Sequence, residues 1–214
     1  YQIEAGYSAT TGQQLWITNR TLTPFTRIAT LPATGGVYGE LNYATAVANG
    51  FSMTTGAKVW GPITLPNANP YSSIGGYQYV SADGICYVWG FGGEIYAINM
   101  ATGAILWTTT TNQIHGDPGT DTPYGIWPLW TFNVGSVADG LLFVPEGHQY
   151  SPPLFRGAKQ WAINITNGQP VWGIMAFDVT TTTAVSEGVM TAFSSYDNQI
   201  YAYSKGPSAM SVTA

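Results

Sequence analysis

The sequence predicts an all-β protein made of repeated four-stranded antiparallel sheets. Short runs of strand-forming residues alternate with glycine-containing turns along the chain, and a Gly-x-x-x-Trp motif occurs four times. Patterns typical of helices are almost absent. Repetition of this kind means that the chain is best divided into units before single strands are placed.

The repeated motif predicts a β-hairpin whose second strand carries the Trp. Ala or Gly stands six positions before each motif Gly, and a small polar residue stands four positions before it. The four pairs are Gly12 and Trp16, Gly56 and Trp60, Gly103 and Trp107, and Gly168 and Trp172. A Gly that supplies a positive φ and a short polar side chain that bonds the turn are typical of tight hairpins. We expect the Trp to fill space between adjacent sheets and the small residue, for example Ala97, to let a neighbouring sheet approach.

A second turn signal completes a unit of four strands. Asp-Gly or Glu-Gly pairs precede the later motifs, and an apolar run follows each pair, at Asp83-Gly84, Asp139-Gly140 and Glu187-Gly188. Successive motif Trp residues are 44, 47 and 65 residues apart. A period of about 45 residues with four strands indicates a β-propeller blade. The expected units are approximately 1–17, 18–61, 62–108, 109–173 and 174–206, with 207–214 beginning a linker or tail.

The eleven residues 97–107 resemble the tryptophan-docking motif of the PQQ-type (pyrroloquinoline quinone) β-propeller repeats. Residues 162–172 resemble it too, and residues 6–16 and 50–60 do so more loosely. The sequence is also similar to those of uncharacterised archaeal surface proteins with such repeats. At about 45 residues per blade, 214 residues make fewer than five blades. We therefore expect a partial propeller or a segment of a larger one, which self-associates through its edge strands or is covered by further blades.

The resemblance does not extend to a catalytic site. Quinone-dependent alcohol dehydrogenases that share this fold place adjacent cysteines over the quinone and hold a calcium ion beside a catalytic Asp. This chain has one cysteine, Cys86, which lies between apolar neighbours and is expected to be a buried strand thiol. We assign no catalytic residue, predict a protein that is not an enzyme, and expect no cofactor, with calcium left open.

Two insertions distinguish the fourth unit. The distance from the preceding motif Trp to the Asp-Gly turn is nine residues longer in the fourth unit than in the third. The distance from that turn to the small residue before the motif is also nine residues longer. The insertions fall at about 111–129 and 146–158, before the first strand and between the second and third strands. In an up-and-down blade both connections emerge on the same face, so we expect the two loops to meet.

The inserted loops hold the candidate binding residues, because long loops on rigid scaffolds commonly carry function. These residues are His115, Asp117, Asp121, Trp127, Glu146, His148, Tyr150 and Arg156. A metal would take its ligands from Asp117, Asp121, Glu146 and His148. Alternatively, an aromatic-lined groove that also includes Trp130 could bind a sugar or peptide. A third interpretation is structural, with turn-forming Asp, backbone-bonding His and an Arg156 ion pair pinning the loops.

Composition excludes several classes of function. The chain has six Lys or Arg and eleven Asp or Glu, and its charged fraction of 8% compares with a usual value of about 25%. Scattered basic residues argue against a nucleic-acid partner, and no apolar run is long enough to span a membrane. A surface rich in Thr, Asn, Ser, Gly and aromatic residues is expected to be extracellular or at the cell surface. Asn19 and Asn164 stand in sequons, so each is a candidate glycosylation site.

Three functional hypotheses follow from these patterns. The first is a non-catalytic extracellular scaffold or interaction module that binds a protein or surface glycan through the inserted loops. The second is a quinone- or metal-dependent oxidoreductase related to the quinoproteins. The third is a building block of a surface layer or filament that assembles through strand edges.

Overall fold

The computed structural model describes residues 2–24, 26–66, 68, 78–90, 94–109, 135–145, 159–175, 184–194 and 198–204. These residues form seventeen strands and no helix. Accordingly, none of the described residues belongs to a helix that is long and apolar enough to cross a membrane.

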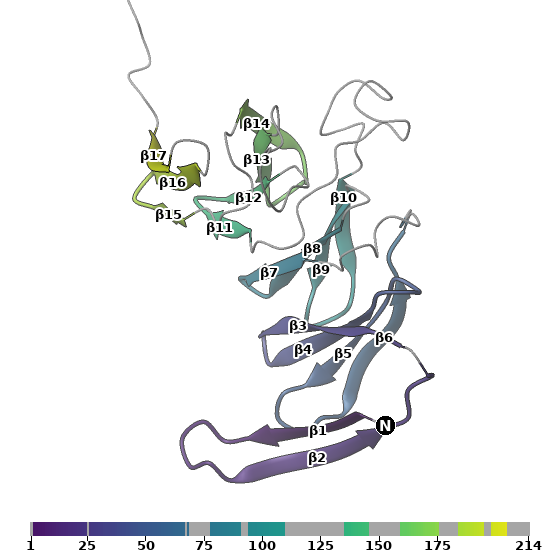
Figure 1. Ribbon diagram of the computed structural model, residues 1–214. Helices are drawn as coiled ribbons and strands as arrows, with labels where there is room; N and C mark the ends of the chain where they lie inside the picture. Colours follow the sequence, from purple (N-terminus) through teal and green to yellow (C-terminus); the bar gives the residue numbers. More distant parts are fainter. Residues whose placement is uncertain are drawn as a thin grey trace, which may run out of the picture.

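The strands form five antiparallel sheets in sequence order (Figure 1). The first sheet is a hairpin of β1 (Gln2–Tyr7) and β2 (Gln14–Arg20). Three four-stranded sheets follow, made of β3 (Ile28–Thr34), β4 (Val37–Asn42), β5 (Val47–Ser52) and β6 (Lys58–Thr64); β7 (Gln78–Ala82), β8 (Ile85–Trp89), β9 (Ile95–Asn99) and β10 (Ile105–Thr109); and β11 (Ser136–Ala138), β12 (Leu141–Pro145), β13 (Lys159–Asn164) and β14 (Pro170–Met175). The last sheet contains β15 (Ala184–Ser186), β16 (Val189–Ser194) and β17 (Gln199–Ser204).

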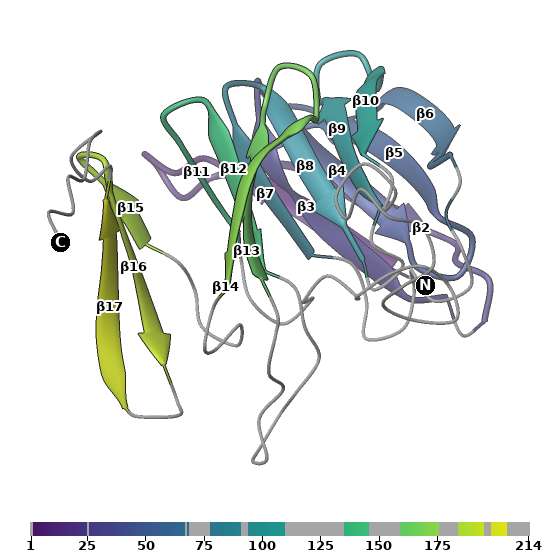
Figure 2. The same cartoon turned by 90° about the horizontal axis from the view of Figure 1, so that it is seen from above.

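The sheets lie face against face along an open arc, with β1 and β2 at one end and β15 to β17 at the other (Figures 1 and 2). The first strands of successive sheets are neighbours, since β3 contacts β7, β7 contacts β11, and β11 contacts β15. The first strand of each complete sheet therefore lies on the inner side of the arc, and the Trp-bearing strand lies at the opposite edge of the sheet. This is the arrangement of blades in a β-propeller, as the sequence predicts.

Apolar side chains from facing sheets fill the spaces between them. One core cluster joins the second and third sheets and includes Leu31, Leu41 and Tyr96, and a second joins the third and fourth sheets. Cys86 lies in the first cluster with no exposed surface, which confirms the expected buried thiol. The cluster between the fourth and fifth sheets is smaller, with only Phe143, Ala162 and Met190 buried. Packing is thus densest in the middle of the arc.

The predicted turns are confirmed. The motif glycines adopt positive φ angles, as at Gly56 (69°), and the Asp-Gly and Glu-Gly pairs place both residues in this region. The small polar residue bonds the turn as expected, because Asn99 Oδ1 accepts the backbone N–H groups of Ala101 and Thr102. The second sheet uses Gly35-Gly36 for its first turn, with φ angles of 61° and 78°. The Asp-Gly pattern alone does not detect this turn.

The small residue six positions before the motif Gly has a second role beside the expected one. At Ala97 it is buried in the apolar cluster between the third and fourth sheets. It pairs across the hairpin with the Trp of its own sheet, as Gly50 does with Trp60 and Ala97 with Trp107. A Cβ atom added at Gly6 or Gly50 would overlap the indole of that Trp. The small residue therefore lets the indole lie across its own sheet before it reaches the next one.

Candidate functional site

Each motif Trp in the first three sheets contacts the turn of the following sheet. Its indole N–H donates to the backbone carbonyl three residues before the next motif Gly, from Trp16 to Met53, Trp60 to Met100 and Trp107 to Ile165, at 2.8, 2.6 and 2.8 Å. A Cβ atom on the next Gly would lie 2.5 to 2.7 Å from the indole carbons, so only Gly allows this approach. The three contacts define a repeated sheet-to-sheet junction.

The first junction also contains a partly buried polar network. Gln2, Glu4 and Arg20 from the hairpin face Tyr38 and Glu40 on β4. Arg20 forms ion pairs with Glu4, at 2.9 Å, and with Glu40. The Tyr38 hydroxyl donates to Glu4 at 2.6 Å, and Gln2 Nε2 donates to Glu40 at 3.2 Å. Among the described residues these are the two ion pairs between side chains, so the network is the main polar connection of the hairpin to the rest of the arc.

The network places two carboxyl groups beside one guanidinium, which drives their pKa values apart. Burial, followed by the hydrogen bond and charge of Glu4, raises the pKa of Glu40 to about 7 despite Arg20. Burial also raises the pKa of Glu4, but hydrogen bonds from Glu40 and Tyr38 and the charge of Arg20 outweigh it, so the net shift is downward. Burial raises the pKa of Tyr38 to about 12, which keeps its hydroxyl a neutral donor. Near neutral pH the carboxyl pair therefore holds a proton on Glu40 for part of the time.

The Glu40→Gln variant is expected to be more stable than the unmodified chain at pH 8. The raised pKa of Glu40 means that its contribution to stability is fully present below its usual pKa of about 4.5 and is lost as pH rises through about 7. Glutamine has no carboxyl proton to lose, so thermal melts of the variant should lack the decline that the unmodified chain shows between about pH 4.5 and 7. The lowered pKa of Glu4 acts oppositely, and its contribution should still disappear in acid in both proteins. An identical decline in both would contradict this assignment.

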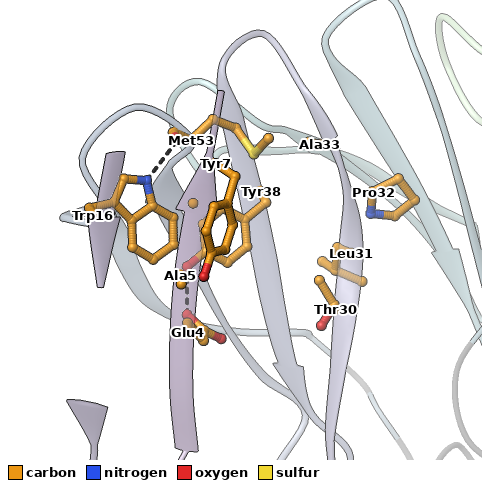
Figure 3. Close-up of a pocket in the computed structure, with 11 residues that line it drawn as sticks. Glu4, Ala5, Tyr7, Trp16, Thr30, Leu31, Pro32, Ala33, Tyr38 and Met53 are labelled. Atoms are coloured by element: carbon orange, nitrogen blue, oxygen red, sulfur yellow. Dashed lines mark hydrogen bonds between the residues drawn. The ribbon is translucent and has the colours of Figure 1, made fainter. Parts of the chain in front are cut away.

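A pocket of about 500 Å³ opens beside the network, between β1 and the β3–β4 half of the second sheet (Figure 3). Glu4, Tyr7 and Trp16 line it from the hairpin, and Leu31 and Tyr38 line it from the sheet. Trp16 and Tyr38 stack with ring centroids 6.2 Å apart and an angle of 5° between the planes. The pocket thus combines an aromatic wall with one carboxylate, and its carboxylate is already bound to Arg20 and Tyr38.

A smaller pocket of about 310 Å³ lies next to Glu40. Glu40 and Asn49, which are cross-strand partners, line it together with threonines of the connection between β2 and β3. Asn49 Oδ1 is buried there and accepts no hydrogen bond from the described residues. Two pockets thus adjoin the network, one lined by Glu4 and Tyr38 and the other by Glu40.

All eight residues of the predicted binding site lie outside the described residues, as do the segments 111–129 and 146–158. Their flanking residues are placed. Ser136, at the start of β11, pairs with Phe143 near the end of β12, and Pro145 pairs with Gln160 at the start of β13. The chain therefore enters β11, leaves β12 and enters β13 at one end of the fourth sheet. That the eight residues lie close together therefore stays a prediction.

The two sequons differ in their surroundings. Asn19 lies on β2 with an exposed side chain. Asn164 ends β13, and its Oδ1 accepts the backbone N–H of Thr166 at 2.8 Å, so its amide forms part of a turn. Neither position is blocked by burial, although the amide of Asn164 is engaged.

Sequence reasoning did not find the Glu4, Arg20 and Glu40 cluster. The three residues are separated by 16 and 20 positions and belong to two different sheets. One signal was available, because charged residues are rare in this chain and these three stand within strands rather than turns. Strand charges in such a sequence indicate buried partners, but the partner cannot be chosen without the sheet order.

The open arc of four-stranded sheets joined through indole contacts defines a protein of the β-propeller class. The model of the family described as outer membrane protein assembly factor BamB matches residues 3–172, and the chain belongs to this family of PQQ-type repeats. A comparison with curated protein sequences found no match.

Solved structures show the same fold at low identity. BamB from Moraxella catarrhalis is 16% identical, with a TM-score of 0.56 over 94% of this chain and 55% of that chain. The computationally designed Ika8 protein is 10% identical, with a TM-score of 0.58 over 93% of this chain and 51% of that one. The designed Ika4 protein is 11% identical, with a TM-score of 0.54 over 92% of this chain and all of that one. The chain thus spans about half the length of the first two.

Proposed function

We propose that the chain is a non-catalytic interaction module of an extracellular or cell-surface protein, and that it binds a protein partner or a surface glycan through residues 111–129 and 146–158. The observation that carries this proposal is the common position of the nearest described residues after the first segment and on either side of the second, because Ser136, Pro145 and Gln160 lie at one end of the fourth sheet. Two long segments anchored together on a rigid sheet are suited to forming one binding surface.

The family supports a binding role rather than an enzymatic one. Its description as an outer membrane protein assembly factor names an assembly function. The chain's own chemistry agrees, since burial raises the pKa of Cys86 to about 12 and keeps this thiol neutral and enclosed. Within the described part of the chain, no group of three or more His, Cys, Asp or Glu residues could hold a metal ion. We propose a protein that works without a cofactor, on the ground of the assembly role that the family description names.

An external location is proposed on two grounds. The charged fraction is 8%, and the exposed Asn19 stands in a sequon that a glycosylating compartment could use. Two resemblances fit this proposal. The sequence resembles those of archaeal surface proteins, and the indole junctions resemble those of tryptophan-docking repeats. A mass increase that a glycosidase removes and an Asn19→Gln change abolishes would support it.

His148→Ala is the direct test of the binding loops. Binding of the chain to a glycan array, and its crosslinking to proteins on intact cells, should fall at least tenfold while the melting temperature stays unchanged. Thr54→Ala is the matched control, because Thr54 is exposed in the turn between β5 and β6, far along the chain from both loops. Loss of folding in His148→Ala would instead indicate a structural role for this residue.

The enzymatic alternative has a separate readout. The intact protein is incubated with pyrroloquinoline quinone and calcium, and reduction of an artificial dye is measured with simple alcohols as substrates. We expect no reduction above the protein-free control. Calcium-dependent turnover that a chelator abolishes would contradict the non-catalytic assignment.

A further inference from the structure

The pocket of about 310 Å³ beside Glu40 is formed by two strands and one connection. Alternate residues of a strand point to one face of a sheet, and residues paired on the neighbouring strand share that face. One face of the second sheet thus supplies Glu40 and Asn42 from β4 and Val47 and Asn49 from β5. The connection from β2 to β3 (Figure 1) supplies Thr21, Leu22, Thr23 and Thr26. All the lining residues lie between positions 21 and 49.

A buried carboxyl group forms the inner side of the pocket. Glu40 is 5% exposed, whereas three of the four threonines that line the pocket are exposed to solvent. The hydrogen bonds that Gln2 and Arg20 donate to this carboxyl group both end on Oε1. Oε2 accepts from neither of them. The pocket therefore runs from hydroxyl groups at its mouth to a carboxyl oxygen on its buried side.

Further polar groups of the pocket have hydrogen-bonding capacity left. Asn49 Oδ1 is buried and has no hydrogen-bond partner among the described residues. Thr26 is half-buried, and its hydroxyl makes no hydrogen bond within the same part of the chain. Asn42 differs, because its Oδ1 already accepts the backbone N–H of Ala44 at 2.9 Å. Amide and hydroxyl groups both donate and accept, so a ligand in this pocket meets both kinds of partner.

The pocket offers hydrogen bonds with little net charge. Glu40 is the one ionisable residue among those that line it, and the Arg20 guanidinium balances its charge in an ion pair. Burial also raises the pKa of Glu40 to about 7, which reduces its charge near neutral pH. No lining residue is basic, so an anion would find no counter-charge there. These features favour a neutral ligand.

Aliphatic side chains complete the lining. Leu22, Ile28 and Val47 are half-buried, and none of the lining residues is aromatic. The pocket can therefore pack C–H groups but offers no ring face for stacking. Its volume stands at the low end of the roughly 300–1,000 Å³ of ligand pockets, which suits one small ring. A compact neutral molecule with hydroxyl groups beside C–H groups meets all these conditions, and a monosaccharide is such a molecule.

We propose that this pocket binds a single neutral sugar residue. The sugar hydroxyls bond to Glu40 Oε2, Asn49 and Thr26, and the C–H groups pack on Ile28 and Val47. The proposal goes beyond the function proposed above, because the pocket uses no residue of the segments 111–129 and 146–158. The bound sugar contacts both the second sheet and the connection to the first hairpin, so it also ties these two parts together.

Nuclear magnetic resonance on the full, isotope-labelled chain tests the site. Glucose, galactose, mannose and N-acetylglucosamine are titrated one at a time. We expect at least one of them to bind saturably with a dissociation constant of roughly 1 mM, because a small pocket makes few hydrogen bonds. The backbone amide signals that shift should belong to residues 21–24, 26–28 and 40–49. The affinity should be the same at low and high salt concentration, as for a neutral ligand.

Three variants locate the site. Thr26→Val keeps the shape of the side chain but removes the hydroxyl, and the affinity should fall roughly three- to tenfold. Val47→Phe fills the pocket, and binding should disappear. Thr18→Val is the matched control, because Thr18 is also half-buried but lies on β2 and does not line the pocket, so its variant should bind like the unmodified chain. Thermal melts establish that each variant is folded, and Thr26→Val decides if Val47→Phe is not.

Three results would overturn the proposal. They are the absence of saturable shifts with all four sugars, shifts that lie away from the lining residues, and an equal loss of affinity in Thr18→Val. Calcium chloride is titrated as a comparison, since a carboxylate with amide and hydroxyl oxygens is also a ligand set for a hard cation. If calcium shifts the same amides and no sugar does, the pocket is a cation site instead.

Discussion

Replacing Trp60 with Ala is expected to lower the free energy of unfolding by about 3–5 kcal/mol. The indole of Trp60 is 7% exposed, lies over Gly103 and donates to the Met100 carbonyl at 2.6 Å, so the substitution removes a large buried ring and leaves a cavity between two sheets. Equilibrium denaturation in urea measures the loss. Trp107→Ala should fall in the same range, because its indole donates to Ile165 and lies over Gly168.

Trp60→Phe separates the ring from the hydrogen bond. Phenylalanine retains most of the packing but cannot donate to Met100, so the expected loss is about 1 kcal/mol beyond that of the reduced ring area. An unchanged melting temperature in Trp60→Ala would mean that the indole does not hold the second and third sheets together.

Arg20→Met is expected to release the first hairpin at pH 8. The change leaves Glu4 and Glu40 facing each other with no cation, and the side chains of these residues are only 15% and 7% exposed. Removing one partner from a fully buried ion pair typically costs about 3–5 kcal/mol, and the loss here should be smaller because the network is partly buried. Arg20 also lies 3.5 Å above the ring of Phe51, and methionine keeps part of that contact. Hydrogen exchange of the β1 and β2 amides measures the release.

The charge argument has two internal checks. Glu40→Gln added to Arg20→Met should restore most of the lost protection, because it removes one of the two opposed carboxylates. Lowering the pH below the raised pKa of Glu40, about 7, should act in the same direction. Arg27→Met is the control, since Arg27 is exposed and only approaches the ring of Tyr43 at 5.2 Å. If Arg27→Met were equally costly, the effect would not come from the buried network.

The sequence predicts the sheets well because their signals are local. A Gly with positive φ four residues before a Trp specifies a hairpin regardless of what surrounds it, and each such hairpin is found. The contact of Gly50 with the indole of its own sheet was missed because sequence spacing does not say which sheet a side chain crosses. The Glu4, Arg20 and Glu40 network was missed because its members meet only when two sheets stack. The loop site at 111–129 and 146–158 stays a prediction.

The position of Cys86 makes the centre of the arc accessible to a chemical measurement of its own. The thiol has no exposed surface and is the only one in the chain, so a thiol reagent can react only after β8 has separated from its neighbours. When closing is fast compared with the reaction, the labelling rate divided by that of a free thiol gives the fraction of time the third sheet stands open. The unmodified protein therefore carries a probe of local opening at the place where its packing is densest.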